Sequence, residues 1–293
     1  MKKSKGRLIK IFSAAAAVAG ALFAGLAADS YGLVRTDYTI YSEKVSRTYT
    51  IAHLSDLHDT LFGKGQSQLL ELIKEADPDI VVLTGDIYDD KEKNLNTDLL
   101  IKGLEGYNCF FVSGNHEIYD FKGYPAHVEF MKSCGISVLE NETLYLNDEI
   151  ALTGFADSTD DYGGQRTETH NILSHVTAFT ATEDYAALKN DSRFHLMLIH
   201  YPNFFDLYTE QGVFDLVLCG HTHGGQWRIP GRKEGLFGPG ATLFPEYSGG
   251  FYEKNGTAMI VSKGLSRHEI IPRIFNNPEL AVIRISPKGT DSK

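Results

Sequence analysis

The sequence predicts an α/β domain that follows a membrane segment at the N-terminus. From Thr48 onward, short apolar runs rich in β-branched residues alternate with amphipathic runs of helical spacing, which is typical of α/β folds. A basic flank and an apolar stretch precede this region. The chain has 293 residues, 42% of them hydrophobic and 23% charged, so it can bury the core of one such domain with a short appendage.

The N-terminal region has the pattern of a membrane anchor. Five basic residues between Lys2 and Lys10 precede an apolar stretch from Ile11 to Ala28. Because the positive side of such a segment stays in the cytoplasm, we expect the rest of the chain to be extracytoplasmic. Eighteen residues are few for a spanning helix, and the small residues at 25–27 offer a signal peptidase site. We expect an uncleaved single-pass anchor in the cell membrane; the alternative is secretion after cleavage.

The elements of the domain follow from their periodicity. Residues 67–76 have the spacing of a helix that Pro78 ends, and the β-branched run at 79–84 predicts a strand buried on both faces. By the same criteria, strands are predicted at 38–41, 51–55, 108–112, 136–139, 143–146, 150–155, 194–199 and 214–218, and helices at 96–104, 124–133, 183–189 and 203–209. A Gly- and Pro-rich loop follows, and two hairpin-like strands, 256–262 and 279–285, end the domain.

The predicted organisation therefore has four parts. They are a basic flank with an anchor or signal (1–28), a stalk (29–47), one globular domain (48–287) and a tail (288–293). A formal charge of −10 is unfavourable for a nucleic-acid groove, which needs clustered Lys and Arg. Three scattered cysteines are too few for a disulfide framework or a thiolate zinc site.

Polar residues that can bind metal follow five of the predicted strands. In open α/β sheets, the crevice beyond the carboxyl ends of the strands is where ligands bind. The residues at this edge are Asp56 and His58, Asp86, Asn115 and His116, His200, and His221 and His223. A histidine at one strand end is usually a structural residue, but the repetition at five strands predicts a metal site.

The chemistry of this set favours two transition-metal ions. Imidazole and carboxylate ligands suit Mn, Fe, Co or Zn, whereas calcium prefers oxygen ligands alone. These residues include at least seven candidate ligands, more than one tetrahedral ion uses, so two divalent ions are expected, about 3.5 Å apart across a shared carboxylate. Such a pair lowers the pKa of a water between them towards about 7 and leaves a small positive charge that attracts phosphate.

The order of the motifs resembles that of a known family. The segments Asp56-x-His58, Gly85-Asp86, Gly114-Asn115-His116-Glu117, His200 and Gly220-His221-x-His223 are similar to the signature of the calcineurin-like metallophosphoesterases. The resemblance spans about residues 48–287 and implies a four-layer α/β/β/α sandwich of two mixed sheets. Gly224-Gly225-Gln226 and the stretch from Pro272-Arg273 to Asn277-Pro278-Glu279 further resemble the membrane-anchored bacterial branch.

The resemblance also implies a role for each motif residue. Asp56, His58 and His223 would bind one metal, and Asn115, His200 and His221 the other, with Asp86 between them. His116 would be the catalytic residue, either as general acid for the leaving group or as a ligand of the phosphate. Glu117 would orient the neighbouring loops. His53 is expected in the core, and His127, His170, His175, His195 and His268 at the surface.

The expected function is hydrolysis of phosphate esters with two divalent metal ions. Membrane tethering favours a phosphodiesterase that acts on a cell-envelope or lipid-linked substrate. The alternatives are a nucleotidase or phosphomonoesterase of the same superfamily, or a metal-binding scaffold without turnover. The loop from Trp227 to Tyr247 mixes basic and aromatic residues and either covers the sheet edge or contacts a substrate or lipid headgroup. The oligomeric state stays open.

Overall fold

The computed structural model describes residues 30–120, 122–156, 179–180, 182–210, 212–238, 242–267 and 272–289, together with Gly20 and Gly25. The predicted membrane segment at 11–28 otherwise lies outside these residues, as do His170, His175, His268 and most of the predicted tail. Within the described ranges, no helix combines the length and apolar character that crossing a bilayer requires.

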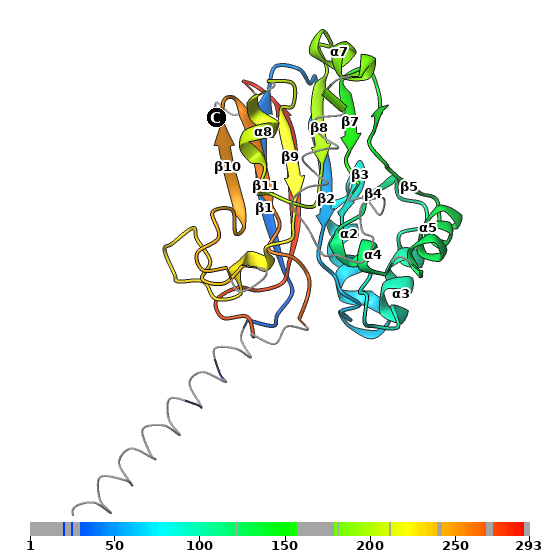
Figure 1. Ribbon diagram of the computed structural model, residues 1–293, viewed down its shortest axis with the longest axis vertical. Helices are drawn as coiled ribbons and strands as arrows, with labels where there is room; N and C mark the ends of the chain where they lie inside the picture. Colours follow the sequence, from blue (N-terminus) through cyan, green and yellow to red (C-terminus); the bar gives the residue numbers. More distant parts are fainter. Residues whose placement is uncertain are drawn as a thin grey trace, which may run out of the picture.

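Two six-stranded mixed sheets form the centre of the fold (Figure 1). The first has the order β1 (Val34–Ser42), β12 (Glu279–Pro287), β2 (Tyr49–Leu54), β3 (Ile80–Thr84), β4 (Cys109–Val112), β5 (Ile136–Val138). The second has the order β10 (Gly250–Lys254), β11 (Thr257–Val261), β9 (Leu216–Cys219), β8 (Phe194–Leu198), β7 (Ile150–Gly154), β6 (Glu142–Tyr145). Strands β2 to β5 are parallel, as are β7, β8, β9 and β11.

Three apolar clusters show how the layers pack. The middle cluster joins Val82 and Phe110 of the first sheet to Leu196 and Leu216 of the second, so the sheets pack face to face. The outer face of the first sheet packs against α2 (Ser67–Ala76), α3 (Leu95–Gly103) and α5 (Tyr124–Ser133), and that of the second against α7 (Glu183–Lys189) and α8 (Phe205–Glu210). The predicted α/β/β/α layering is present.

Local sequence explains the central elements. In α2, Leu69, Ile73 and Ala76 recur at helical spacing and are the buried residues. In β3 all five side chains are buried, because a central parallel strand is covered on both faces. The structure places α2, α5 and α7 at the predicted bounds.

The strand pairing at the end of the chain differs from the prediction. Strands β11 and β12 do not form a hairpin, since β12 inserts between β1 and β2 in the first sheet. The hairpin partner of β11 is β10, which the sequence analysis missed, and the two-residue turn between them is Asn255-Gly256 with both residues at positive φ. That dipeptide is a strong hairpin signal. The range predicted as a stalk contains β1, which pairs with β12 along nine residues.

His195 was expected at the surface and is buried. Only 2% of the residue is exposed, and its Nδ1 donates a hydrogen bond to the Val213 carbonyl at 2.9 Å. The residue sits on a central strand of the second sheet, where alternate side chains point into a core. His53 is fully buried, as predicted, with Nε2 2.8 Å from Thr84 Oγ1.

Candidate metal centre

The predicted ligands lie where the carboxyl ends of the parallel strands of both sheets meet. Backbone hydrogen bonds tie the loops together, from Asp56 N to Gly85 O at 3.0 Å and from Gly220 N to His200 O at 3.0 Å. These loops follow β2, β3, β8 and β9. The loop after β4 leads into the short helix α4 (Asn115–Tyr119), which begins with a predicted ligand.

The backbone is strained at this edge. Five of the predicted ligands have left-handed φ values, namely Asp56 (51°), His58 (46°), Asp86 (52°), His221 (71°) and His223 (48°). A non-glycine residue in this region costs on the order of 1 kcal/mol or more. Such outliers gather where the surroundings fix a functional geometry, and here they lie in the loops after β2, β3 and β9.

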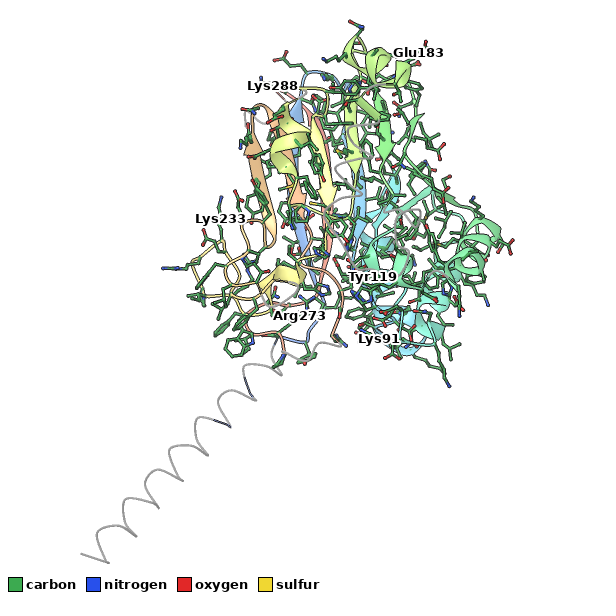
Figure 2. All side chains as sticks on the ribbon, viewed as in Figure 1. Lys91, Tyr119, Glu183, Lys233, Arg273 and Lys288 are labelled. Carbon is green, nitrogen blue, oxygen red and sulfur yellow. The ribbon has the colours of Figure 1, made fainter. Side chains whose placement is uncertain are left out.

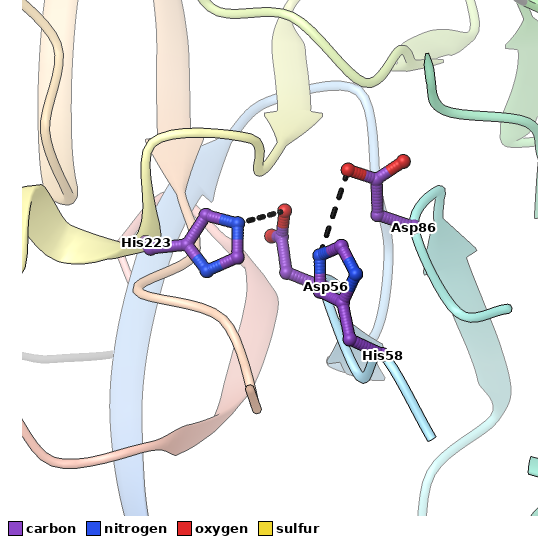
Figure 3. Close-up of side chains that lie close together, drawn as sticks. All are labelled: Asp56, His58, Asp86 and His223. Atoms are coloured by element: carbon purple, nitrogen blue, oxygen red, sulfur yellow. Dashed lines mark ion pairs between the residues drawn. The ribbon is translucent and has the colours of Figure 1, made fainter. Parts of the chain in front are cut away.

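Four buried side chains form the first cluster (Figure 3). Asp56, His58, Asp86 and His223 each offer one ligand atom, and these atoms all lie within 4.8 Å of one another. His58 Nε2 is 3.6 Å from Asp86 Oδ2, and His223 Nε2 is 3.5 Å from Asp56 Oδ1. The spacing suits atoms that surround one ion.

A second cluster shares Asp86 with the first. The ligand atoms of Asp86, His200 and His221 also lie within 4.8 Å of one another. His200 Nε2 is 3.2 Å from Asp86 Oδ2 and 3.2 Å from His221 Nδ1. Because one carboxylate belongs to both clusters, the two groups of side chains are adjacent candidate positions for metal ions.

The unpaired polar atoms here fit a metal. Asn115 Oδ1 and His58 Nε2 are buried and have no hydrogen-bond partner among the described residues. Leaving such an atom unsatisfied costs about 1–3 kcal/mol. A metal ion supplies the missing partner, and the imidazole, amide and carboxylate donors are those that Mn, Fe, Co and Zn accept.

Neighbouring acceptors set which nitrogen of two histidines faces the cluster. His58 Nδ1 donates to the Asp89 carboxylate at 2.9 Å, and His200 Nδ1 donates to the Thr84 carbonyl at 2.7 Å. Since those nitrogens are already bonded to acceptors, Nε2 of each ring is the nitrogen left for a metal ion, which would displace any proton there. Ligating histidines are commonly held in this way.

The buried carboxylate of Asp86 makes the cluster favourable for positive charge. Burial lowers the pKa of His200, but the adjacent Asp86 carboxylate outweighs this and raises the pKa to about 10. Burial likewise opposes ionisation of Asp86, yet the charges of His200 and His116 hold its pKa well below the usual range. Burial and the nearby His200 charge lower the pKa of His221 to about 3. A buried carboxylate that draws protons onto its neighbours is a place where a cation is stable.

Glu117 holds two of the ligand loops together. Its buried carboxylate accepts backbone N–H groups from Asp86 (2.8 Å), Ile87 (2.8 Å), Tyr88 (3.0 Å) and Gly114 (2.8 Å). Burial and the Asp86 charge raise the pKa of Glu117 to about 7. The side chain therefore fixes the loop after β3 against the start of α4.

His116 lies at the rim and does not join the shared clusters. Its side chain is 22% exposed, and Nδ1 is 2.7 Å from Asp90 Oδ1 and 3.6 Å from Asp89 Oδ2. The backbone N–H of His116 donates to Asp86 Oδ1 at 2.8 Å. The sequence analysis missed both aspartates, although they follow Asp86 closely on the same loop.

Two residues near the C-terminus position His223 and were not predicted. Asn276 Nδ2 donates to the His223 carbonyl at 2.8 Å. The fully buried Arg273 donates to the carbonyls of Ser266 (2.7 Å), Lys263 (2.8 Å), His223 (3.4 Å) and Gly264 (3.4 Å). The only signal in the sequence was their place in the stretch that resembles the anchored branch.

Comparison with known proteins gives matches over most of the chain. The sequence profile described as calcineurin-like phosphoesterase matches residues 49–225. An uncharacterized metallophosphoesterase of Aquifex aeolicus is 30% identical, covering 89% of this chain and 95% of that protein. The uncharacterized metallophosphoesterase YkuE of Bacillus subtilis is 29% identical, covering 97% and 99%. A solved dimetal phosphatase from Danio rerio is 12% identical over 75% of this chain and 88% of that one, with a TM-score of 0.48.

Proposed function

Because the chain belongs to the calcineurin-like phosphoesterase family, we propose that its seven predicted ligands hold two divalent metal ions and that His116 acts on the substrate beside them. The protein is a metal-dependent hydrolase of phosphoric esters that uses two divalent ions. The ligand assignment rests on one observation, the pair of buried clusters that share Asp86.

Each ion has its own ligands in this proposal. Asp56, His58 and His223 hold one ion, and Asp86 is common to both. The other is held by Asn115, His200 and His221, with the unpaired amide oxygen of Asn115 as its ligand atom. Two such ions supply Lewis acidity for the phosphoryl group and lower the pKa of a water molecule towards about 7.

His116 is placed to meet the leaving group. Nδ1 lies 2.7 Å from Asp90 Oδ1, an ion-pair distance without a hydrogen bond, and we assign Nε2 as the nitrogen that meets a substrate oxygen. The ring packs edge-on against His58 with centroids 4.4 Å apart, which keeps it beside the metal cluster while part of it stays exposed. Donation of a proton from Nε2 to the departing oxygen is general acid catalysis.

The charges around His116 favour a diester substrate. Asp89 and Asp90 both approach its ring, and the hydrogen bond from His58 outweighs burial to lower the pKa of Asp89 to about 2. A phosphate monoester carries close to two negative charges at neutral pH, whereas a diester carries one. Carboxylates beside the leaving group therefore penalise the monoester more.

The diester preference is tested with p-nitrophenyl phosphate and bis-p-nitrophenyl phosphate, each with Mn, Zn and Mg. We expect the higher kcat/KM for the diester. Asp90→Asn should raise the monoester-to-diester ratio at least tenfold, since a second unit charge about 8 Å away is worth roughly 2 kcal/mol at an effective dielectric of about 20. Asp148→Asn, at an exposed turn, is the control. An unchanged ratio in Asp90→Asn would remove the charge argument.

The natural substrate in this proposal is a phosphodiester of the cell envelope or a lipid-linked one. The basic flank and the apolar stretch at 11–28 support a cell-membrane anchor with the enzyme outside the cytoplasm. Membrane fractions washed with alkaline carbonate should retain the full chain. Recovery of a soluble form whose N-terminus lies near Ala28 would instead indicate secretion after cleavage.

A further inference from the structure

A groove lies where the chain at Ser30 meets two later loops. Its volume is about 370 Å³, and its lining includes Ser30, Ile229, Arg232 and Phe275. The Phe275 N–H donates to Ser30 Oγ at 2.8 Å, and Asn277 Nδ2 donates to the Gly32 carbonyl at 3.0 Å. Ser30 is only 2% exposed, so the chain is fixed at this point.

Two apolar side chains beside this groove face solvent. Phe275 is 47% exposed and Ile229 is 48% exposed. Phe275 also has a φ of 51°, which is unfavourable for a bulky residue and is retained although its ring is not buried. Arg232 is exposed, and no ion pair involves it within the described part of the chain. We call Ile229, Arg232 and Phe275 the interfacial surface.

The sequence places this surface close to the predicted anchor. The apolar stretch ends at Ala28, two residues before Ser30. Two residues reach at most about 7 Å, at roughly 3.3–3.6 Å each. The polar headgroup layer is about 5–7 Å thick on each side of the hydrocarbon core. If residues 11–28 span the bilayer, Ser30 and the Phe275 backbone bonded to it must therefore lie at the headgroup layer.

We propose that the interfacial surface binds the membrane surface, with Phe275 and Ile229 among the headgroups and Arg232 against a lipid phosphate. Apolar side chains beside a basic one are suited to this boundary. The proposal rests on the membrane anchor of the proposed function and adds a second attachment that fixes the orientation of the domain.

The same contact orients the metal centre. Trp227 forms a backbone bridge with Ile274, and Asn276 bonds the His223 carbonyl, so the segment that carries Phe275 also holds a predicted ligand loop. Figure 2 shows Arg273 of this segment far from Glu183 and Lys288, which lie at the other end of the molecule. A phosphate ester at the membrane surface would then lie on the side of the protein that carries the metal site.

The single tryptophan of the chain, Trp227, tests the contact without a label. It adjoins the surface, and its Nε1 donates to the Pro272 carbonyl at 2.9 Å. The full chain is reconstituted into vesicles of phosphatidylglycerol and phosphatidylcholine, with or without bromine on the acyl chains. We expect bromine to quench Trp227. The control is Trp227→Phe with Tyr145→Trp, because Tyr145 is exposed and pairs with Ala151 near the amino end of β7, away from the metal centre.

Substitutions separate the surface from the anchor. Ile229→Ser with Phe275→Asn should float with vesicles as the wild type does but lose most of the quenching; asparagine tolerates the left-handed φ. Arg232→Gln should lose quenching in vesicles that contain phosphatidylglycerol and much less in vesicles of phosphatidylcholine alone. If the wild-type chain floats with vesicles but its tryptophan fluorescence is quenched no more than that of the control, the proposed interfacial surface is wrong. A full chain that does not float overturns the anchor and the surface together. Hydrolysis of bis-p-nitrophenyl phosphate is measured separately, so failure of the catalytic proposal gives a different result.

Discussion

Glu117 offers a sharp test of how the metal centre is held, because one side chain accepts four backbone hydrogen bonds. Glu117→Gln preserves size but replaces one acceptor oxygen with a donor. If the remaining oxygen keeps Ile87 and Tyr88, the new amide faces the N–H groups of Asp86 and Gly114. Two buried donors then have no acceptor.

The magnitude follows from these two lost bonds. Each unsatisfied buried donor costs about 1–3 kcal/mol, which gives roughly 2–6 kcal/mol for the pair. Removal of a buried negative charge near Asp86 offsets part of this, so the low half of that range is expected. Since whole domains are stable by about 5–15 kcal/mol, the change is a large fraction of the free energy of unfolding.

Urea unfolding of the metal-free protein measures this change, and metal content after dialysis reports on the site. Glu117→Gln should lower the free energy of unfolding and bind metal more weakly. Glu129→Gln, an exposed change on α5, should stay within about 0.5 kcal/mol of wild type. The reasoning is refuted if Glu117→Gln is as stable as Glu129→Gln and retains the same metal content.

Two further predictions concern histidines with different environments. His116→Ala should retain both metal ions but lose about 10²–10⁴-fold in kcat on the diester, as expected for a missing general acid; a near-normal rate would exclude that role. Burial lowers the pKa of His53 from 6.5 to about 3, so its contribution to stability is complete above pH 6.5 and is lost as the pH falls, because the unfolded state takes up the proton first. Between pH 6.5 and 5 this amounts to about 2 kcal/mol, and His53→Gln should have a correspondingly flatter pH dependence of unfolding than wild type.

The predicted fold depended on patterns that are local in the chain. The helix at 67–76 and the strand at 80–84 each have an apolar pattern that is complete within a few adjacent residues. The sequence alone could therefore place them. The position of β12 could not be found in this way. Its insertion between β1 and β2 joins residues more than 200 positions apart, and an apolar run does not specify its partner. The strand β10 was missed for a different reason, because its side chains are mostly exposed and only Asn255-Gly256 marks it.

The same distinction between local sequence patterns and long-range contacts applies to the candidate site. Its predicted ligands are found because each follows a buried strand, and topology then brings the strand ends together. Residues that only position a predicted ligand have no comparable pattern in the sequence. Arg273 and Asn276 are ordinary polar residues in a loop. Their role is apparent only from the structure, in which both donate hydrogen bonds to the carbonyl of His223. The link between Asp90 and His116 is likewise apparent only from the distance between their side chains in the structure.

Strain and unsatisfied polarity are concentrated where the ligands lie. Five predicted ligands have positive φ, and Asn115 Oδ1 and His58 Nε2 are buried without a hydrogen-bond partner among the described residues; each of these features costs free energy. The surrounding scaffold opposes collapse of this arrangement, since Glu117 binds the loop of Asp86 and Arg273 binds that of His223. Because these contacts hold the loops, a bound cation would gain partners with little further ordering of the chain. Most buried polar atoms have a hydrogen-bond partner, so two unpaired atoms that both belong to predicted ligands favour a metal centre.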